Sequence, residues 1–408
     1  MNKAPAGATV LLAVASVDQL AVTLSQQGLF ILGAAFKAYA HLGVAETGML
    51  FSAIALGAAV GMLPAGLVLD RLGPKRVAWG SGAAILTTML SLALWLPRNF
   101  GDLAFLLGLA GLFLPALSLT GNTAVTKAFD GSSREGLAIG IRQAATPLGG
   151  ILAASLFPLL VKIWSLKVVL LIIALNAGGW AMGFAWTLKP FPADHPVPRI
   201  RTQGLRATIS QLFPLRYPLL TSFLLGPGQY ALLTYALLDL NERWHIPLEL
   251  AGPIIAMALA GGFVARILMG RQMDRGTDAK KLIIRTALVG SSALAVWALL
   301  PASTPVTVII VLFFALGAGL DGWNGLLTVW VTQASSTAQR GMALALIGMS
   351  AFLGIVLFMP LFGLLIRVSQ SYRPIWGLLA FIYLTGTYFV WRSKKSDLAT
   401  DAKASHNV

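Results

Sequence analysis

The chain of 408 residues has no cysteine, four histidines and few charged residues. The absence of cysteine excludes disulfides, thiolate metal sites and cysteine nucleophiles. The histidines are scattered, so they do not show the spacing of metal ligands. Charged residues make up 11% of the chain, whereas about 25% is usual in soluble proteins. This shortage of charge excludes a large soluble helical protein.

Several catalytic and energy-coupling motifs are also missing. The chain lacks a Gly-x-x-x-x-Gly-Lys-Ser/Thr phosphate loop, so it has no ATP-driven engine of its own. It has no Gly-x-Ser-x-Gly nucleophile elbow and no soluble segment long enough for a catalytic or signalling domain. We therefore expect neither an enzyme nor a sensor, and we expect no cofactor and no metal.

Apolar residues dominate what is present, because 57% of the chain is hydrophobic. A helix needs about 20 apolar residues to cross the hydrocarbon core of a membrane. The first such run continues to about residue 40, which is too long for a secretory signal, so we interpret it as a retained span. Twelve runs qualify, at about 8–38, 48–69, 77–97, 103–126, 136–161, 168–188, 216–240, 250–270, 282–301, 306–332, 341–366 and 374–391.

The longest hydrophilic stretch divides these runs into two sets of six. Residues 189–215 are rich in proline and arginine and are predicted to form a linker. The sequence therefore predicts an all-α polytopic membrane protein with bundles at 1–188 and 216–391, followed by a tail at 392–408.

Basic residues alternate in density between successive loops. Most of the 30 Lys and Arg residues fall in the loops on one side, for example Arg71, Lys75, Arg76, Lys280 and Lys281. Cytoplasmic loops carry this excess, so both termini are predicted to be cytoplasmic. The same bias explains the net charge of +15 without a nucleic-acid partner.

An internal repeat supports the division into halves. The stretch GLVLDRLGPKR at 66–76 has a degraded counterpart, GRQMDRGTDAKK, at 270–281, at an offset of 204. A second pair, at 135–150 and 340–355, aligns at an offset of 205 and places Gly149 on Gly354. Duplicated halves of this kind are a recurrent design of transporters, with the substrate site at their interface.

The first of these stretches gives the sequence a specific resemblance. Gly-x-x-x-Asp-Arg-x-Gly-x-Lys-Arg after the second of twelve spans resembles the signature loop of the major facilitator superfamily, in its bacterial twelve-span type. The resemblance implies the major facilitator fold, with twelve transmembrane helices in two pseudo-symmetric six-helix bundles. It also implies a location in the bacterial plasma (inner) membrane.

The resemblance further implies that the signature loop is a conformational latch between the halves. A carboxylate at the inner end of span 2 can face the positive N-terminal end of a neighbouring helix, here the span that begins near Gly341. Gly66 is expected to permit close helix contact and Gly73 a tight turn. The expected latch residues are Gly66, Asp70, Arg71, Gly73, Lys75, Arg76 and, in the altered second copy, Asp274 and Arg275.

Ionisable residues inside the spans are candidate functional groups, because each costs roughly 2.5–3.5 kcal/mol at mid-membrane. Asp18 and Asp321 are candidate proton sites or substrate contacts; buried structural pairing is the alternative. Arg142 is a candidate partner for an anion; the alternative is an ion pair at the inner rim with Asp130 or Glu135.

Three other charged residues are assigned elsewhere. Arg266 lies one turn before Gly270 and is assigned to the second latch. Asp239 and Lys37 lie at span ends and are expected to reach the outer interface by snorkelling.

Polar and aromatic residues gather on spans 1, 4, 5, 7 and 10. The resemblance implies that spans 1, 4, 7 and 10 line a central cavity. In span 7 the sequence Gly226-Pro227-Gly228 is predicted to break the helix and free backbone groups for a ligand. The candidate substrate or proton site comprises Asp18, Gln26, Asn122, Arg142, Gln143, Gln229, Tyr230, Asp321, Trp323 and Asn324.

The sequence thus predicts a monomeric secondary active transporter working by alternating access. Its expected partners are a small-molecule substrate, protons or another co-transported ion, and the lipid bilayer. An organic or inorganic anion moved with protons is the first hypothesis. A proton-driven exporter of drugs or metabolites is the alternative, which an excess of acids over bases in the cavity would favour.

Overall fold

A computed structural model describes residues 7–129, 135–188, 215–335 and 340–393, and these contain helices and no strand. The first half consists of α1 (Ala8–Ile31), α2 (Gly33–Ala40), α3 (Val44–Trp95), α4 (Phe100–Phe129), α5 (Glu135–Ile163), α6 (Leu166–Ala174), the π-helical turn η1 (Leu175–Gly179) and α7 (Trp180–Thr187). The second consists of α9 (Arg216–Ala231), the π-helical turn η3 (Leu232–Ala236), α10 (Leu237–Trp244), α11 (Leu248–Asp274), α12 (Ala279–Leu299), α13 (Val306–Asp321), α14 (Asn324–Ala334), α15 (Arg340–Ser369) and α16 (Arg373–Arg392).

These helices account for the twelve predicted spans. Ten segments of the described chain are long and apolar enough to cross a membrane. One of them is α3, which the turn at Gly73 divides into two arms. The segment Arg216–Trp244 is not among the ten, although α9, η3 and α10 together cover the seventh predicted span. Counting both arms of α3 and this interrupted segment gives twelve.

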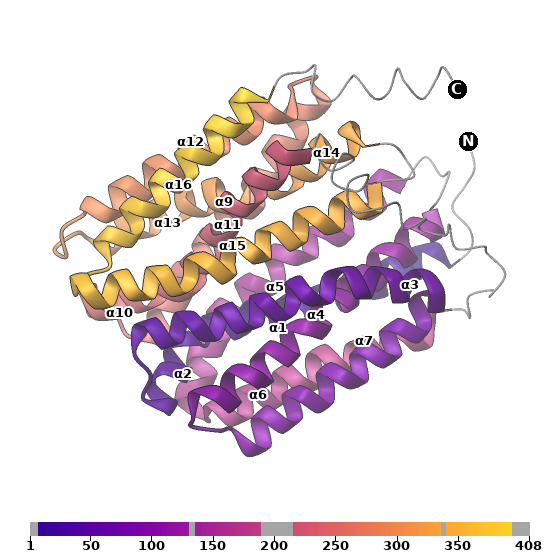
Figure 1. Cartoon of the computed structure of the whole chain (residues 1–408), viewed down its shortest axis with the longest axis horizontal. Helices are drawn as coiled ribbons and strands as arrows, with labels where there is room; N and C mark the ends of the chain where they lie inside the picture. Colours follow the sequence, from indigo (N-terminus) through magenta and orange to yellow (C-terminus); the bar gives the residue numbers. More distant parts are fainter. Residues whose placement is uncertain (1–6, 130–134, 189–214, 336–339, 394–408) are drawn as a thin grey trace.

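The two halves form two bundles that lie side by side along their length (Figure 1). Their internal packing repeats as the sequence predicts. Gly149 of α5 lies against the backbone of α1 at Leu20, and its counterpart Gly354 of α15 lies against the backbone of α9 at Phe223. A side chain at either glycine would overlap that backbone, so both halves use the same position for a close helix contact.

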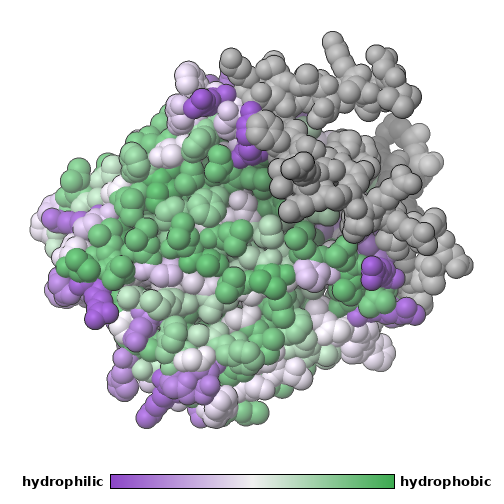
Figure 2. Space-filling model, viewed as in Figure 1, coloured by the Kyte–Doolittle hydropathy of each residue, from purple (hydrophilic) through white to green (hydrophobic). Residues whose placement is uncertain are grey.

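The surface between the helix ends is apolar, and hydrophilic residues gather near the ends (Figure 2). Large apolar side chains such as Leu94, Phe105 and Val311 are about 70% exposed, as expected where lipid replaces water. We call the end with the Gly73 turn and the described chain ends Gly7 and Ser393 the basic end, and the end with α2 and α10 the opposite end (Figure 1).

Contacts between the bundles gather in the half nearer the opposite end. There Lys37 of α2 forms an ion pair with Glu242 of α10 at 2.6 Å. Lys162 at the end of α5 similarly pairs with Glu249 at the start of α11. Deeper in the interface, the Ser52 hydroxyl donates to the Val356 carbonyl at 3.1 Å. The bundles are therefore fastened together at the opposite end.

Three helices differ from the sequence prediction. The first span is not continuous, because α1 ends at Ile31 and α2 begins at Gly33. The predicted break at Gly226–Gly228 is wrong, since α9 runs through Pro227 to Ala231. The glycines serve close packing instead, with Gly226 against Ala351 and Gly228 against Tyr383.

The tenth span is interrupted where the sequence predicts a continuous helix. The segment α13 ends at Asp321 and α14 begins at Asn324. The indole N–H of Trp323 donates to the Leu320 carbonyl at 2.8 Å, and the Tyr383 hydroxyl donates to the same carbonyl at 3.3 Å. These side chains satisfy a backbone group that the interruption frees. Such breaks persist in membranes only where protein or water covers them.

Candidate transport site

Arg142 of α5 is the most buried basic side chain among the described residues of the first bundle, with 1% of its surface exposed. Its Nη1 donates to the Asn122 side-chain oxygen of α4. Its Nη2 donates to the Ser118 carbonyl, one turn earlier on α4, at 3.1 Å. The guanidinium is therefore fixed inside the bundle, and its Nε has no hydrogen-bond partner among the described residues.

Asp18 of α1 lies within electrostatic range of Arg142 and is equally buried. Neither of its carboxylate oxygens has a hydrogen-bond partner in the described chain. A buried carboxylate without such partners is costly. Helices α1, α4 and α5 thus bring the predicted residues Asp18, Asn122 and Arg142 into one cluster with unused polar atoms.

The second bundle holds a matching pair of charges. Arg266 of α11 donates from Nη2 to Asp321 Oδ1 at 2.7 Å, at the interruption of the tenth span. The Asp321 side chain is 3% exposed and that of Arg266 is 22% exposed. The structure therefore corrects the assignment of Arg266 to the second latch, because its partner is Asp321 on the neighbouring helix α13.

Gln26 and Tyr230 link the two bundles. The Gln26 amide of α1 donates to the Tyr230 hydroxyl of α9 at 3.5 Å. The Tyr230 ring packs against Phe30 of α1, with 4.4 Å between ring centroids. Tyr230 also lies within electrostatic range of Asp321 and Arg266. The two predicted residues thus meet across the interface beside the second pair.

The other predicted site residues take separate positions. Gln143 is exposed on α5, and Gln229 is buried on α9. Trp323 is buried, and its N–H is used by the Leu320 carbonyl. Asn324 is half-buried at the start of α14. The structure does not join these four side chains to the charged clusters.

Two glycines make room for the charged groups, and the sequence analysis does not identify them. A Cβ at Gly121 of α4 would overlap the Arg142 guanidinium and come within 2.9 Å of its Cζ. A Cβ at Gly262 of α11 would lie 2.8 Å from Asp321 Oδ2. The only local signal in the sequence is that Gly121 directly precedes the predicted site residue Asn122. Arg142, which Gly121 faces, lies on another helix.

The prediction that Asp239 reaches the outer interface is wrong, since its side chain is fully buried. Its Oδ2 accepts a 2.7 Å hydrogen bond from the Trp376 indole of α16. Its Oδ1 lies 3.3 Å from Arg243 Nε, one turn further along α10. The Arg243 guanidinium stacks over Trp244 at 3.6 Å. Tryptophans that pack over this helix end cover the pair and prevent snorkelling.

Lys37, the other residue predicted to reach the outer interface, is partly exposed and forms an ion pair with Glu242.

At the stretch predicted to act as a latch, the structure shows the expected turn. Gly73 has a φ of 75°, a left-handed conformation that favours glycine, and Gly276 in the second half has a φ of 84°. Gly66 makes no close helix contact, because a Cβ there would meet nothing within 4 Å. This part of α3 lies beyond the fastened half of the interface. Asp70 lies within electrostatic range of Lys127 on α4.

The remaining latch residues lie at the surface of the basic end. Arg71, Arg76 and Arg275 are exposed, and Lys75 is half-buried. The side chain of Asp274, the burial of Gly341 and the whole of Asp130 lie outside the described residues, as does the linker at 189–214. Among the residues that the structure describes, no group of three His, Asp or Glu side chains is placed to hold a metal ion.

Comparisons with known proteins give relatives of this arrangement. The chain is 25% identical over 302 residues to the hexuronate transporter of Bacillus subtilis (strain 168), covering 69% of this chain and 71% of that protein. It is 30% identical over 278 residues to the MFS-type transporter hasB of Aspergillus fumigatus (strain CBS 144.89), covering 64% of this chain and 60% of that protein.

Solved structures share the fold. The nucleoside transporter NupG superposes with a TM-score of 0.75 at 15% identity, covering 94% of this chain and 99% of that one. The inward open conformation of the xylose transporter XylE from E. coli gives 0.75 at 14% identity, covering 98% and 99%. The family model described as Major Facilitator Superfamily matches residues 19–320 and 219–406. The chain is a multi-pass membrane transporter that belongs to the major facilitator superfamily.

Proposed function

We propose that this transporter moves a small organic or inorganic anion together with protons by alternating access. The observation that carries the proposal is the cluster of Arg142 and Asp18. A buried guanidinium in surroundings of low dielectric is a strong partner for a carboxylate or similar anion. Arg142 keeps one N–H without a partner, and Asp18 keeps both oxygens without partners among the described residues.

The balance of charge favours an anion over a cationic drug. An exporter of cations is favoured by an excess of acids along the transport route. Asp321 is paired with Arg266 at 2.7 Å, and Asp18 faces Arg142 within electrostatic range. Each buried acid of the candidate site thus has its own arginine, so no acid is in excess.

The proposed roles follow from these contacts. Arg142 receives the anion, and Asp18 carries the coupled proton, since protonation removes the charge that competes with the substrate for the guanidinium. Gln26 and Tyr230 couple the bundles, because their hydrogen bond crosses the interface beside Asp321. The Arg266–Asp321 pair holds the interrupted tenth span in place.

The proposed cycle rocks the bundles about this region. In the structure they are fastened at the opposite end through Lys37–Glu242 and Lys162–Glu249. Release of these contacts and closure of the latch at the basic end would expose the site to the other side. We place the basic end and both termini in the cytoplasm of a bacterial cell, with the protein in the plasma membrane as a monomer.

Purified protein in proteoliposomes tests the proposal, with glucuronate as the probe because one relative is a hexuronate transporter. Uncharged glucose is the matched control. Counterflow measures binding and exchange, and uptake driven by a pH gradient measures coupling. We expect Arg142→Gln to abolish both, and Asp18→Asn to abolish only the driven uptake. Undiminished counterflow by Arg142→Gln would refute the anion site. For other anions, a thermal-shift screen identifies the probe, and stabilisation by cations alone would refute the substrate class.

A further inference from the structure

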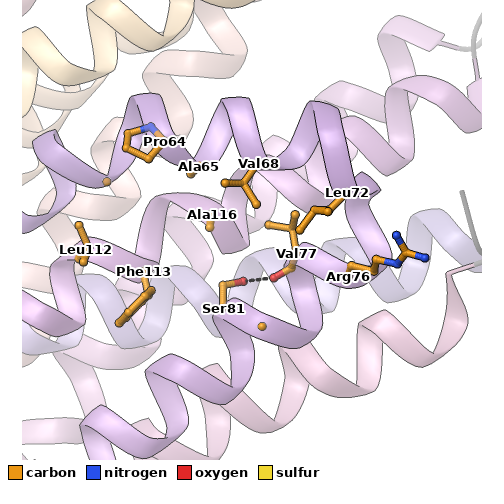
Figure 3. A pocket seen from close by; sticks show the side chains of 12 residues that line it. Pro64, Ala65, Val68, Leu72, Arg76, Val77, Ser81, Leu112, Phe113 and Ala116 are labelled. Atoms are coloured by element: carbon orange, nitrogen blue, oxygen red, sulfur yellow. Dashed lines mark hydrogen bonds between the residues drawn. The ribbon is translucent and has the colours of Figure 1, made fainter. Parts of the chain in front are cut away.

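A pocket of about 470 Å³ lies within the first bundle, between the two arms of α3 and helix α4 (Figure 3). Its volume is within the range of pockets that bind small ligands, about 300–1,000 Å³. The lining is almost wholly apolar, and its hydroxyl group, that of Ser81, already donates to the Val77 carbonyl at 2.6 Å. Lining side chains include Pro64, Val68, Leu72, Phe113 and Ala116.

Glycine packing explains why the pocket begins where it does. Gly57 and Gly61 of α3 bring this arm against the backbone of α4 at Gly108 and Leu112. The first lining residues follow this contact, at Gly61 and Pro64. From there to Leu72 the lining includes Val68, which is larger than glycine, so the helices cannot remain in the same close contact.

The pocket is separate from the candidate transport site. Phe113 lines it, whereas the Asn122 side chain accepts a hydrogen bond from Arg142. Nine residues along a helix correspond to a net rotation of about 180°, so these two side chains lie on nearly opposite faces of α4. Val68 and Leu72 are 41% and 45% exposed. The pocket thus opens on an apolar outer face of a membrane protein.

Positive charge stands at one end of the pocket. Arg76 contributes to the lining, and its guanidinium extends toward the basic end (Figure 3). It is exposed and has no ion-pair partner recorded within the described chain. The acid nearest in sequence, Asp70, is engaged electrostatically by Lys127 of α4. An apolar chamber with one cation at its rim matches a ligand with a hydrocarbon chain and an anionic head.

We propose that this pocket binds one acyl chain of an anionic phospholipid from the leaflet at the basic end, with the headgroup on Arg76. The surrounding medium supplies this ligand, and basic side chains at a membrane surface attract anionic headgroups. The bound chain fills the space where α3 and α4 no longer pack together. This site is independent of the transported substrate.

Filling the pocket tests the proposal. Gly80 lines the pocket, and a Cβ there meets nothing within 4 Å. Gly80→Leu therefore fits without a backbone clash and occupies the volume of the chain. Gly183→Leu is the matched control, because Gly183 of α7 is equally free of neighbours and lies outside the lining. Val68→Phe is a second filling variant, and gel filtration checks that each variant folds.

Native mass spectrometry of the full chain in detergent counts the lipids retained. The probes are dioleoyl phosphatidylglycerol and dioleoyl phosphatidylcholine, which share their chains and differ in charge. We expect one phosphatidylglycerol retained by the original protein and by Gly183→Leu, with at least a tenfold preference over phosphatidylcholine. Gly80→Leu and Val68→Phe should reduce its retention at least tenfold.

The headgroup contact has its own control. Arg76→Gln should remove the preference for phosphatidylglycerol, whereas Lys281→Gln, an exposed basic residue of the other bundle, should preserve it. The proposal is overturned if the filling variants retain phosphatidylglycerol as well as Gly183→Leu does. It is also overturned if Arg76→Gln keeps the tenfold preference.

Discussion

We predict that removing Arg266 lowers the free energy of unfolding more than removing its partner Asp321 does. Arg266 Nη2 and Asp321 Oδ1 are 2.7 Å apart, and the arginine side chain is 22% exposed while the aspartate is 3% exposed. Breaking a buried pair by removing one partner costs about 3–5 kcal/mol, because a buried charge is left without compensation. The residue that remains determines where in that range each variant falls.

The two single variants therefore differ. Arg266→Ala leaves Asp321 buried with no cation, and its Oδ2 already lacks a partner among the described residues, so we expect a cost near the upper value of about 5 kcal/mol. Asp321→Ala leaves an arginine that can turn its partly exposed head toward water, so we expect a cost near or below about 3 kcal/mol. The double variant should cost less than the sum, since neither charge is stranded.

Unfolding by SDS in mixed micelles, followed by tryptophan fluorescence, measures these costs on the purified transporter. The double-variant cycle isolates the pairwise energy if both single variants keep the helical content of the original protein. Equal costs for the two single variants would contradict the reasoning from exposure. Additive costs in the double variant would show that the 2.7 Å contact contributes no coupling.

Two further predictions concern Arg142 in the first bundle and Asp239 in the second. Gly121→Ala should displace the Arg142 guanidinium and reduce anion counterflow at least tenfold in proteoliposomes. The control Gly183→Ala should leave counterflow unchanged, because nothing lies within 4 Å of a Cβ at that position. Equal counterflow by the two variants would show that Arg142 does not need the space at Gly121. Asp239→Ala should lower the free energy of SDS unfolding by about 3–5 kcal/mol, because it leaves Arg243 without its partner. Asp239→Asn should lower it less, because an amide oxygen can still accept the hydrogen bond from Trp376. Equal losses for the two variants would contradict this reasoning.

The sequence predicts the fold well because the membrane imposes strong local rules. A span needs about 20 apolar residues, and loops on one side collect Lys and Arg. The turn at Gly73 follows from glycine and proline in succession, and its φ of 75° confirms it. The repeat of Gly149 and Gly354 predicts equivalent helix contacts, and both glycines make them.

The site was only partly predictable, because its contacts join helices far apart in sequence. Charge inside an apolar span singles out Asp18, Arg142 and Asp321 in the sequence. Nothing local indicates that Arg266 faces Asp321, which lies 55 residues later. Asp239 lies at a span end, where snorkelling is the usual outcome. Its burial depends on Trp376, from a helix 137 residues away.

The π-helical turn at Leu232–Ala236 and the break after Asp321 also have no reliable local signal. A π turn adds one residue to the hydrogen-bonded ring, and neighbouring helices decide where that is tolerated. Trp323 and Tyr383 supply the compensation at the broken span, and Tyr383 comes from the twelfth span.

The central claim is that two bundles rock about a shared site, and distances between spin labels at the two ends test it most directly. The chain has no cysteine, so pairs can be introduced without background. Thr126 and Lys281 are exposed at the basic end, and Trp164 and Ala302 are exposed at the opposite end. Double electron–electron resonance should show a shorter Thr126→Cys/Lys281→Cys distance and a longer Trp164→Cys/Ala302→Cys distance in the same population when substrate or pH shifts the equilibrium. Distances that stay fixed, or that change in the same direction at both ends, would contradict the account.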